Sequence, residues 1–500
     1  MINQKRSQCT CVSLNLCQTR KRARNIFALV TGLFLSSWQT YAADLTLSNL
    51  ELMHHRDTSK DLRVKFEVRW QHAWRNEKNH DAAWIVVKFL QGDNGYRHAL
   101  LAERGHVVLR NNLDDASQPA IKVSADRVGC FIYPSAPHRG PVAWTIEVAL
   151  DTAVLGQRGF NLNNARVAVY GVEMVYIPTG AFTLGDPDTT ALRFGAFYRA
   201  DNAGRYAGLF RITAEKIAIP IGKEKDALYY RADEGYEGDQ SGPLPAEFPK
   251  GYQAFYAMKY EMTQGEYAAF LSSLSQEQSQ TRANFGGKGY SRLRGAIKIE
   301  NETYRADSPK RPCNFLSWDD ACAYADWAGL RPMTELEFTK ACRGSGAPLA
   351  HEYPWGTASK DQLVRVIDTH DDLVMSNGMN EGELTDKNRA KFGASYYWVM
   401  DLAGSLWERV ITVGDSLGRA FRGTHGDGRV NYYGYAHNAD WPRGNTETAG
   451  FGFRGGGFYE RHQAYSEFNP HSPIAYRRFG AWAGGNRTQA YGSRFVRTAE

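Results

Sequence analysis

The stretch NFLSWDDACAYADWAGLRPMTELEFTKACRG, residues 314–344, sets the character of the C-terminal two thirds of the chain. Apolar residues recur at helical spacing over 315–330, and Ser317 is the expected N-cap of this helix. Thr334 is followed three residues later by Glu337, which is the spacing of a capping box. The stretch therefore predicts two short helices that follow each other closely.

Similar local signals occur on both sides of this stretch. Residues 174–186 read as a strand, a Pro-Thr-Gly turn and a second strand, and residues 255–274 change from a strand to a helix. Thr263 and Glu266 form another capping-box pair at that change. After residue 344 the helical periodicity fades, and glycine, tyrosine, arginine and tryptophan dominate. Loops that a rigid scaffold holds in place commonly carry function.

The N-terminal part of the chain has a different pattern, in which short runs of β-branched and aromatic residues alternate with polar or Gly/Pro/Asn turns. These runs are residues 64–70, 82–90, 106–110, 128–134, 142–150 and 165–172. They predict an immunoglobulin-like β-sandwich over residues 43–170, followed by a second domain over residues 171–500. The expected fold class is α+β.

Residues 1–42 have the pattern of a secretory signal peptide. A basic region around residues 20–24 precedes an apolar run at 26–37, and small residues follow at Ala42 and Ala43. The alternative is a membrane anchor, but 12 apolar residues fall short of the ~20 that a bilayer core requires. We therefore expect a periplasmic or secreted protein, cleaved after Ala42, that does not span a membrane.

The net charge excludes one class of partner. The formal net charge is +6, and residues 1–42 contain six Lys/Arg and no Asp/Glu, so the mature chain is formally neutral. A basic footprint is the usual mark of a nucleic-acid-binding surface. Binding to nucleic acid is therefore not expected.

Four cysteines remain after residue 42, at positions 130, 313, 322 and 342. None of them has the CxxC spacing of a zinc site. Cys322 and Cys342 fall on the two neighbouring predicted helices, and an oxidising compartment permits disulfides. We predict a Cys322–Cys342 disulfide; the alternative is that both are buried free thiols.

Seven segments of the second domain resemble the formylglycine-generating-enzyme (sulfatase-modifying-factor) family, in the order in which that family has them. They are MVYIPTGAFTLGD (174–186), KYEMTQGEYAAFL (259–271), residues 314–344, EYPWG (352–356), MDLAGSLWERV (400–410), FRGGGFY (453–459) and YGSRFVRT (491–498). The resemblance implies a fold related to C-type lectins with little regular secondary structure. It also implies relatives that use copper and oxygen to convert a sulfatase cysteine to formylglycine.

This chain departs from the family at the residues that carry the oxidation. The family's two copper-binding cysteines follow an Arg-Gly-Gly-Ser turn, which here reads Arg-Gly-Gly-Gly at 454–457, and their positions carry Glu460 and Tyr465. Carboxylate and phenol oxygens are hard ligands, whereas thiolates are the soft ligands that hold Cu(I). Copper is therefore not expected.

The resemblance also implies a structural calcium site. The family holds calcium with an Asx side chain and backbone carbonyls just before its Trp-Glu pair. The matching residues are Asp401, Leu402, Gly404 and Leu406, and calcium prefers such hard oxygen ligands. The alternative is an ordinary turn that Asp401 caps.

These observations favour a non-oxidase that binds a peptide, protein or glycan ligand in a C-terminal groove around Phe458, Glu460, Arg461 and Tyr465. Tyrosine, tryptophan and arginine are the residue types that dominate recognition surfaces, and they crowd residues 431–482. Two alternatives stay open. One is an enzyme of altered chemistry in which Glu460 is the acid or base, and the other is a true oxidase with other ligands.

Overall fold

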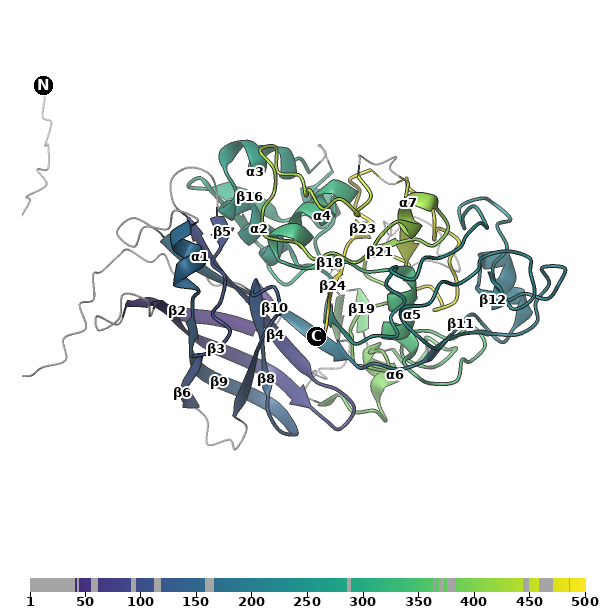
Figure 1. Cartoon of the computed structure of the whole chain (residues 1–500), viewed down its shortest axis with the longest axis horizontal. Helices are drawn as coiled ribbons and strands as arrows, with labels where there is room; N and C mark the ends of the chain where they lie inside the picture. The colour runs from purple at the N-terminus through teal and green to yellow at the C-terminus, as the bar shows by residue number, and fades with distance from the viewer. Residues whose placement is uncertain are drawn as a thin grey trace, which may run out of the picture. The chain divides into compact units, whose positions relative to one another are not determined.

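The computed structural model describes most of the chain after residue 40 (Figure 1). The described residues are 41–42, 45–54, 62–90, 96–111, 118–157, 166–285, 289–363, 365–367, 373–375, 383–443, 449–457, 471–484 and 486–500. Residues 1–40 of the predicted signal peptide lie outside them, and its last two residues, Tyr41 and Ala42, are described as strand β1. Within the described ranges, no helix is both long and apolar enough to cross a bilayer.

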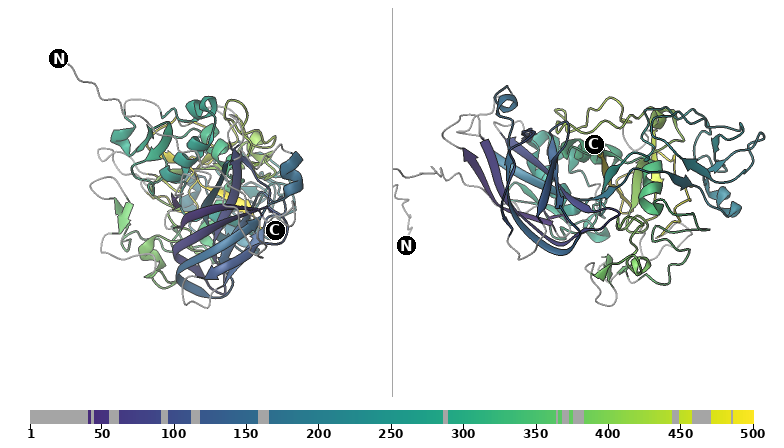
Figure 2. Two further views of the ribbon diagram at one scale, coloured as in Figure 1. Left: turned by 90° about the vertical axis from the view of Figure 1, so that its left-hand side faces the viewer. Right: turned by 60° about the horizontal axis from the view of Figure 1, so that its bottom comes forward.

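Two open β-sheets contain the longest strands, and their purple to blue strands are followed most easily in Figure 2. The five-stranded sheet has the order β1 (Tyr41–Ala42), β2 (Leu45–His54), β3 (Leu62–Arg75), β9 (His138–Ala149) and β6 (Val107–Asn111). The eight-stranded sheet has the order β18 (Arg331–Pro332), β24 (Phe495–Thr498), β15 (Phe255–Met258), β10 (Arg166–Ile177), β4 (Asp81–Leu90), β8 (Gly129–Pro134) and β7 (Pro119–Val123), with β5 (Tyr96–His98) beside β4. The six predicted N-terminal strands are thereby confirmed.

Strand β4 is buried on both faces. Ile85 and Val87 face the five-stranded sheet and join a hydrophobic cluster with Phe66 and Trp144. The alternate residue Trp84 points the other way, because successive side chains of a strand lie on opposite faces. Its indole Nε1 donates to the carbonyl of Ala328, 2.9 Å away. The eight-stranded sheet is thus a central layer that touches both the N-terminal strands and the helices.

Strand β10 crosses the position at which the sequence predicts a domain boundary. Its residues 166–175 pair with β4, and its residues 174–177 pair with β15 of the C-terminal part. Position 170 therefore lies inside a strand of a sheet that both parts build. An immunoglobulin-like sandwich is not confirmed, because β10 also pairs with β15 and so belongs to a sheet that it shares with C-terminal strands.

The predicted helices form where their capping residues place them. The longer helices are α2 (Gln264–Ser273), α3 (Gln276–Arg282), α4 (Trp318–Trp327) and α5 (Glu335–Arg343). Thr263, Ser317 and Thr334 each accept a hydrogen bond from the backbone N–H three residues on, and each is part of a complete capping box. Satisfying these otherwise unpaired N–H groups fixes where each helix begins.

The remaining elements are short, which agrees with the expectation of little regular structure in the C-terminal part. The helices are α1 (Thr152–Gln157), η1 (Thr189–Phe194), η2 (Ser291–Leu293), α6 (Arg389–Phe392) and α7 (Ser416–Arg419). The two-stranded sheets are β11 (Phe182–Leu184) with β13 (Phe210–Ile212), β12 (Tyr198–Arg199) with β14 (Leu228–Tyr229), β16 (Ile297–Glu300) with β17 (Thr303–Ala306), and β19 (Arg365–Ile367) with β20 (Leu373–Met375). A three-stranded sheet joins β22 (Phe451–Arg454), β21 (Trp407–Ile411) and β23 (Tyr491–Gly492). This last sheet positions the candidate site.

Candidate functional site

The predicted ligand-binding residues lie between two described segments. Phe458, Glu460, Arg461 and Tyr465 are outside the described residues, which end at Gly457 and resume at His471. Both flanks are buried: Arg454 ends strand β22, and Arg477 follows the gap. The contacts of these two flanks therefore show how the chain is held on either side of the segment that carries the predicted groove residues.

One carboxylate holds both flanks. Glu335, the first residue of α5, accepts hydrogen bonds from Arg477 Nε at 2.9 Å and from Arg477 Nη2 at 3.0 Å. It also accepts one from Arg454 Nη1 at 3.2 Å and one from the backbone N–H of Val413 at 2.8 Å. Burial opposes ionisation of Glu335, but the two arginines outweigh burial and lower its pKa. The ionised carboxylate thus ties α5 to both ends of the segment 458–470.

The Arg-Gly-Gly-Gly turn is closely packed. Gly455 and Gly456 have φ of +90° and +80°, a conformation that favours glycine. A Cβ atom on Gly457 would lie 2.5 Å from Cδ1 and 2.6 Å from the backbone nitrogen of Trp407. Trp407 therefore occupies the space that a side chain at 457 would need, and the third glycine is a requirement of the packing here.

The loop that carries the predicted calcium ligands packs against this turn. Asp401, Gly404 and Ser405 all have positive φ, at 58°, 98° and 60°. The N–H of Gly404 donates to the carbonyl of Gly455 at 3.1 Å. Several left-handed residues within five positions fold the loop tightly, so that the Asp401 carboxylate is only 8% exposed.

Three carboxyl groups, those of Glu408, Glu261 and Asp401, interact electrostatically with the guanidinium of Arg494 beside this loop. Arg494 donates to Glu408 from Nε at 3.0 Å and from Nη2 at 2.8 Å. Glu261 accepts from the N–H of Leu406 at 2.9 Å through Oε1, while its buried Oε2 has no hydrogen-bond partner in the described part of the chain. Burial, followed by the charge of Glu408, raises the pKa of Glu261 well above its usual value. Burial and the charge of Asp401 also raise the pKa of Glu408, so a further cation beside Arg494 would stabilise the ionised forms of these carboxyl groups.

A hollow of about 290 Å³ lies between α4 and the segment 431–443. It is lined by Asp319, Cys322, Asn431, Tyr435, Ala436, Asn438, Trp441, Pro442 and Arg443. Tyr432 and Tyr433 adjoin it in sequence and are 67% and 61% exposed. Exposed aromatic side chains next to a hollow that apolar and polar residues line together are typical of a recognition surface.

The aromatic and arginine residues of 431–482 divide into two groups. Tyr432, Tyr433 and Tyr435 are exposed, whereas Trp441 and Tyr476 are buried. Arg282 lies over the ring of Tyr435 at 4.2 Å, which holds the turn at 431–435 against α3. Part of this residue set therefore builds the core, and part faces solvent.

Comparison with known proteins decides the family. The profile of the sulfatase-modifying factor enzyme 1-like domain matches residues 163–497, about two thirds of the chain. The chain belongs to this family.

Individual relatives match shorter stretches. The formylglycine-generating enzyme of Thermomonospora curvata is 33% identical over 103 residues, covering 20% of this chain and 33% of that protein. The enzymes of the same name from Streptomyces coelicolor and Bos taurus are 30% identical over 131 residues and 28% identical over 102 residues. These two matches cover 25% and 20% of this chain, and 40% and 26% of the relatives. The chain thus aligns with well under two thirds of each relative's length.

The four described cysteines, three of them in the sulfatase-modifying-factor domain, are unpaired. Cys130, Cys313, Cys322 and Cys342 are all buried free thiols. The predicted Cys322–Cys342 disulfide is wrong, because α4 and α5 direct these residues into different hydrophobic clusters. Burial raises the pKa of Cys322 and Cys342 well above the usual thiol value.

Three residues of the candidate site, Glu335, Glu261 and Arg477, have no strong signal in the sequence. Glu335 reads as an ordinary first-turn acid of α5, and Glu261 lies in the strand-to-helix segment 259–271 without a distinctive spacing. Arg477 lies 142 residues from Glu335. A glutamate flanked by apolar residues, as at 261, is the one feature that could have prompted a search for a partner.

Proposed function

We propose that this chain is an exported member of the sulfatase-modifying-factor family that binds a peptide or a glycan without oxidising a cysteine. One combination carries the proposal. The buried Glu335 network braces both flanks of the segment 458–470, while Glu460 and Tyr465 occupy the positions of the family's cysteines. A buried support combined with altered reactive residues favours binding over the family's redox chemistry.

The thiols elsewhere in the chain support this reading. The sequence has no cysteine beyond Cys342. Copper(I) binds thiolates, and deprotonation of a buried thiol is unfavourable in apolar surroundings. Burial raises the pKa of Cys313 and of Cys342 well above the usual value. These thiols are therefore poorly suited to replace the missing pair.

The proposed ligand surface extends from the groove around Phe458, Glu460, Arg461 and Tyr465 to the exposed tyrosines at 432 and 433. Tyrosine offers a large rigid contact area together with a hydroxyl group, which suits both peptide backbones and sugar rings. Asn438 and Arg443 in the hollow add hydrogen-bonding groups. Export rests on the signal-peptide pattern of residues 1–42.

We also propose a structural calcium ion held by Asp401 with the backbone of Leu402, Gly404 and Leu406. The donor set fits this ion, because it consists of a carboxylate and carbonyl oxygens. The unpaired Oε2 of Glu261 and the excess of carboxyl groups over Arg494 support a divalent cation at this place. The ion would neutralise the loop that supports the Arg-Gly-Gly-Gly turn.

The proposal is tested by incubating the purified chain with a Cys-x-Pro-x-Arg peptide, copper and oxygen. A parallel reaction with the Streptomyces coelicolor formylglycine-generating enzyme serves as the positive control. We expect the peptide cysteine to stay unmodified with this chain, as read by mass spectrometry. Formylglycine in the product would overturn the non-oxidase proposal.

The rival reading is an enzyme of altered chemistry that uses Glu460 as its acid or base. Peptide-library and glycan-array screens first provide a ligand. Glu460→Gln is then compared with the unmodified chain for both binding and conversion of that ligand. Binding that survives, with no conversion by either protein, is the expected result. Conversion that disappears only in Glu460→Gln would establish the rival.

A further inference from the structure

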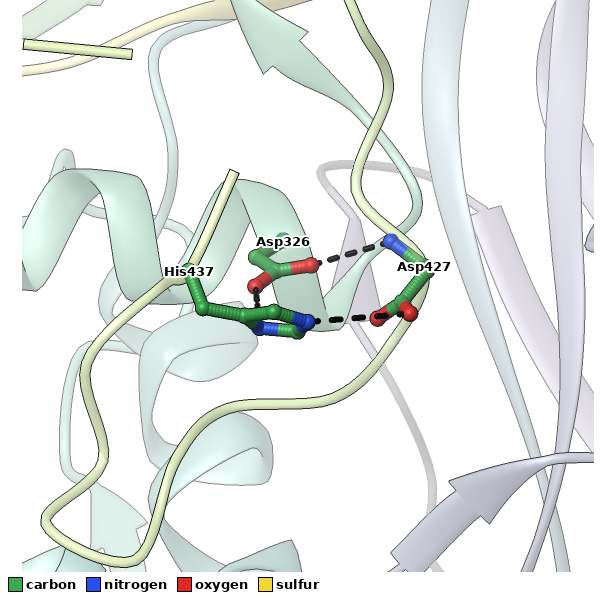
Figure 3. A group of neighbouring side chains, drawn as sticks. All are labelled: Asp326, Asp427 and His437. Atoms are coloured by element: carbon green, nitrogen blue, oxygen red, sulfur yellow. Dashed lines mark hydrogen bonds and ion pairs between the residues drawn. The ribbon is translucent and has the colours of Figure 1, made fainter. Parts of the chain in front are cut away.

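Three side chains from distant parts of the sequence meet at the C-terminal end of α4 (Figure 3). Asp326 belongs to the last turn of the helix, and Asp427 and His437 come from the long segment that follows β21. His437 Nδ1 lies 3.5 Å from Asp326 Oδ2, and His437 Nε2 lies 3.8 Å from Asp427 Oδ2. The imidazole thus lies between the two carboxylates, and one of its nitrogens and one oxygen of each carboxylate lie within 4.8 Å of one another.

Asp326 lacks a complete set of partners. Its side chain is fully buried, and its Oδ1 accepts a hydrogen bond from the N–H of Asp427 at 2.9 Å. Within the described part of the chain its Oδ2 is paired only with His437 Nδ1, at 3.5 Å, and points toward it. One long contact to a half-exposed imidazole compensates a buried carboxylate oxygen poorly, and the negative end of the α4 dipole adds to that cost. Both effects favour a cation at this position.

The backbone brings Asp427 to the helix end. Gly426 N donates to the carbonyl of Leu330 at 2.8 Å, and Gly428 N donates to the carbonyl of Asp326 at 2.9 Å. A Cβ atom on Gly426 would lie 2.3 Å from Cα of Asp326, so the segment lies directly against the helix. The backbone at Asp427 is therefore held against the helix end before any ligand binds.

Lys88 is the other charged group at this helix end. It is fully buried, donates to the carbonyl of Trp327, and has its Nζ 3.4 Å from Nε2 of His98. Burial lowers its pKa well below the usual lysine value. Lys88 is thus occupied by the helix terminus and does not complete the coordination of Asp326 Oδ2.

We propose that Asp326, Asp427 and His437 bind a divalent transition-metal ion of the zinc type. Ligand atoms about 2.0–2.2 Å from such an ion lie within about 4.4 Å of one another. The three donor atoms here already lie within 4.8 Å. Asp427 and His437 are 53% and 48% exposed, so they are free to adjust and water has access to the remaining positions. An imidazole ligand favours such an ion over calcium or magnesium.

The ion would fasten the segment 427–437 to α4. That segment carries Tyr432, Tyr433 and Tyr435 and forms one wall of the hollow. A metal ion that joins a long loop to a helix reduces the conformational freedom of the loop. Any binding surface on the loop is then better organised. Metal binding itself does not depend on the proposed function.

The test is isothermal titration of the metal-free chain with Zn²⁺, compared with Asp427→Asn and His437→Gln. The matched control is His351→Gln, which removes another His–Asp pair, with His351 Nε2 3.1 Å from Asp188 Oδ2. We expect one equivalent of tight Zn²⁺ binding in the unmodified chain and in the control, and loss of that equivalent in both variants. Excess Ca²⁺ should not displace the ion.

Three outcomes would overturn the proposal: no such equivalent in the unmodified chain, its survival in both variants, or its displacement by Ca²⁺. The first would mean that the three side chains form an ion pair only. Circular dichroism checks that the variants fold, and the backbone bonds of residues 426–428 do not involve the substituted side-chain atoms. Limited proteolysis gives a second readout, since Zn²⁺ should slow cleavage within 427–437 in the control and not in the variants.

Discussion

Glu335 and Arg477 form a two-point ion pair at 2.9 and 3.0 Å in which both side chains are fully buried. The two residues are 142 positions apart. The pair joins the start of α5 to the segment after the predicted groove. It therefore holds one flank of the segment that carries the predicted groove residues.

Replacing Arg477 with methionine should destabilise the protein by about 3–5 kcal/mol, because it leaves a buried carboxylate with one of its two charged partners missing. Denaturant unfolding measures the loss. Arg231→Met is the control, since it breaks the largely exposed pair with Asp233 and should change stability little. Equal losses in the two variants would refute the structural role of the buried pair.

The pH dependence of stability should include a contribution from His471. Burial lowers the pKa of His471 to about 4, from an ordinary value of 6.5. Below pH 6.5 the unfolded chain therefore binds a proton that the folded chain does not, so stability falls as pH drops from 6.5 to 4. The slope for one such group is up to about 1.4 kcal/mol per pH unit.

Unfolding free energies of the unmodified chain and of His471→Gln, measured from pH 7 to pH 4, check this. The variant should show a shallower acid slope. Burial also lowers the pKa of His80, to about 3, so a residual slope should remain in the variant. Identical slopes in both proteins would contradict the assignment.

Calcium should stabilise the chain through Asp401. At a free concentration 100 times its dissociation constant, a ligand that binds only the folded state adds about 2.7 kcal/mol. Asp401→Gly keeps the left-handed backbone, where φ is 58°, and removes the carboxylate. We expect calcium to raise the melting temperature of the unmodified chain and of Asp427→Asn. An equal rise in Asp401→Gly would argue against this site.

Tyr432 and Tyr433 should contribute to ligand affinity but not to stability. Each replacement by alanine should weaken binding about tenfold or more if the ring is a central contact. Leu417→Ala is the control, since Leu417 is 52% exposed on α7 and away from the hollow's lining. Unchanged affinity in the tyrosine variants would place the ligand elsewhere.

The sequence predicts those features that depend on neighbours in the chain. The helix starts at Thr263 and Thr334 follow from capping-box pairs only three positions apart, and the start at Ser317 follows from its role as an N-cap. The N-terminal strands follow from local β-branched and aromatic runs. The family assignment follows from motif order, which needs no knowledge of packing.

Features that depend on distant partners were not predictable in this way. The antiparallel pairing of β10 with β15 requires the register of Met174 opposite Met258, which no local pattern reveals. Asp326 and Asp427 are 101 residues apart, so their convergence has no spacing signature. The Cys322–Cys342 prediction failed for a related reason, because helices adjacent in sequence can turn their cysteines toward different parts of the core.

Strand β24 lies between β15 and β18 and has consequences for biosynthesis. Residues 495–498 form the second strand from one edge of a sheet whose strand β4 is made some 400 residues earlier. Arg497 lies over the ring of Trp84 at 4.4 Å, so the late segment also covers an early aromatic residue. Until translation reaches these residues, the nascent chain exposes an unpaired edge of β15. Such an edge is a target for chaperones and a risk for aggregation.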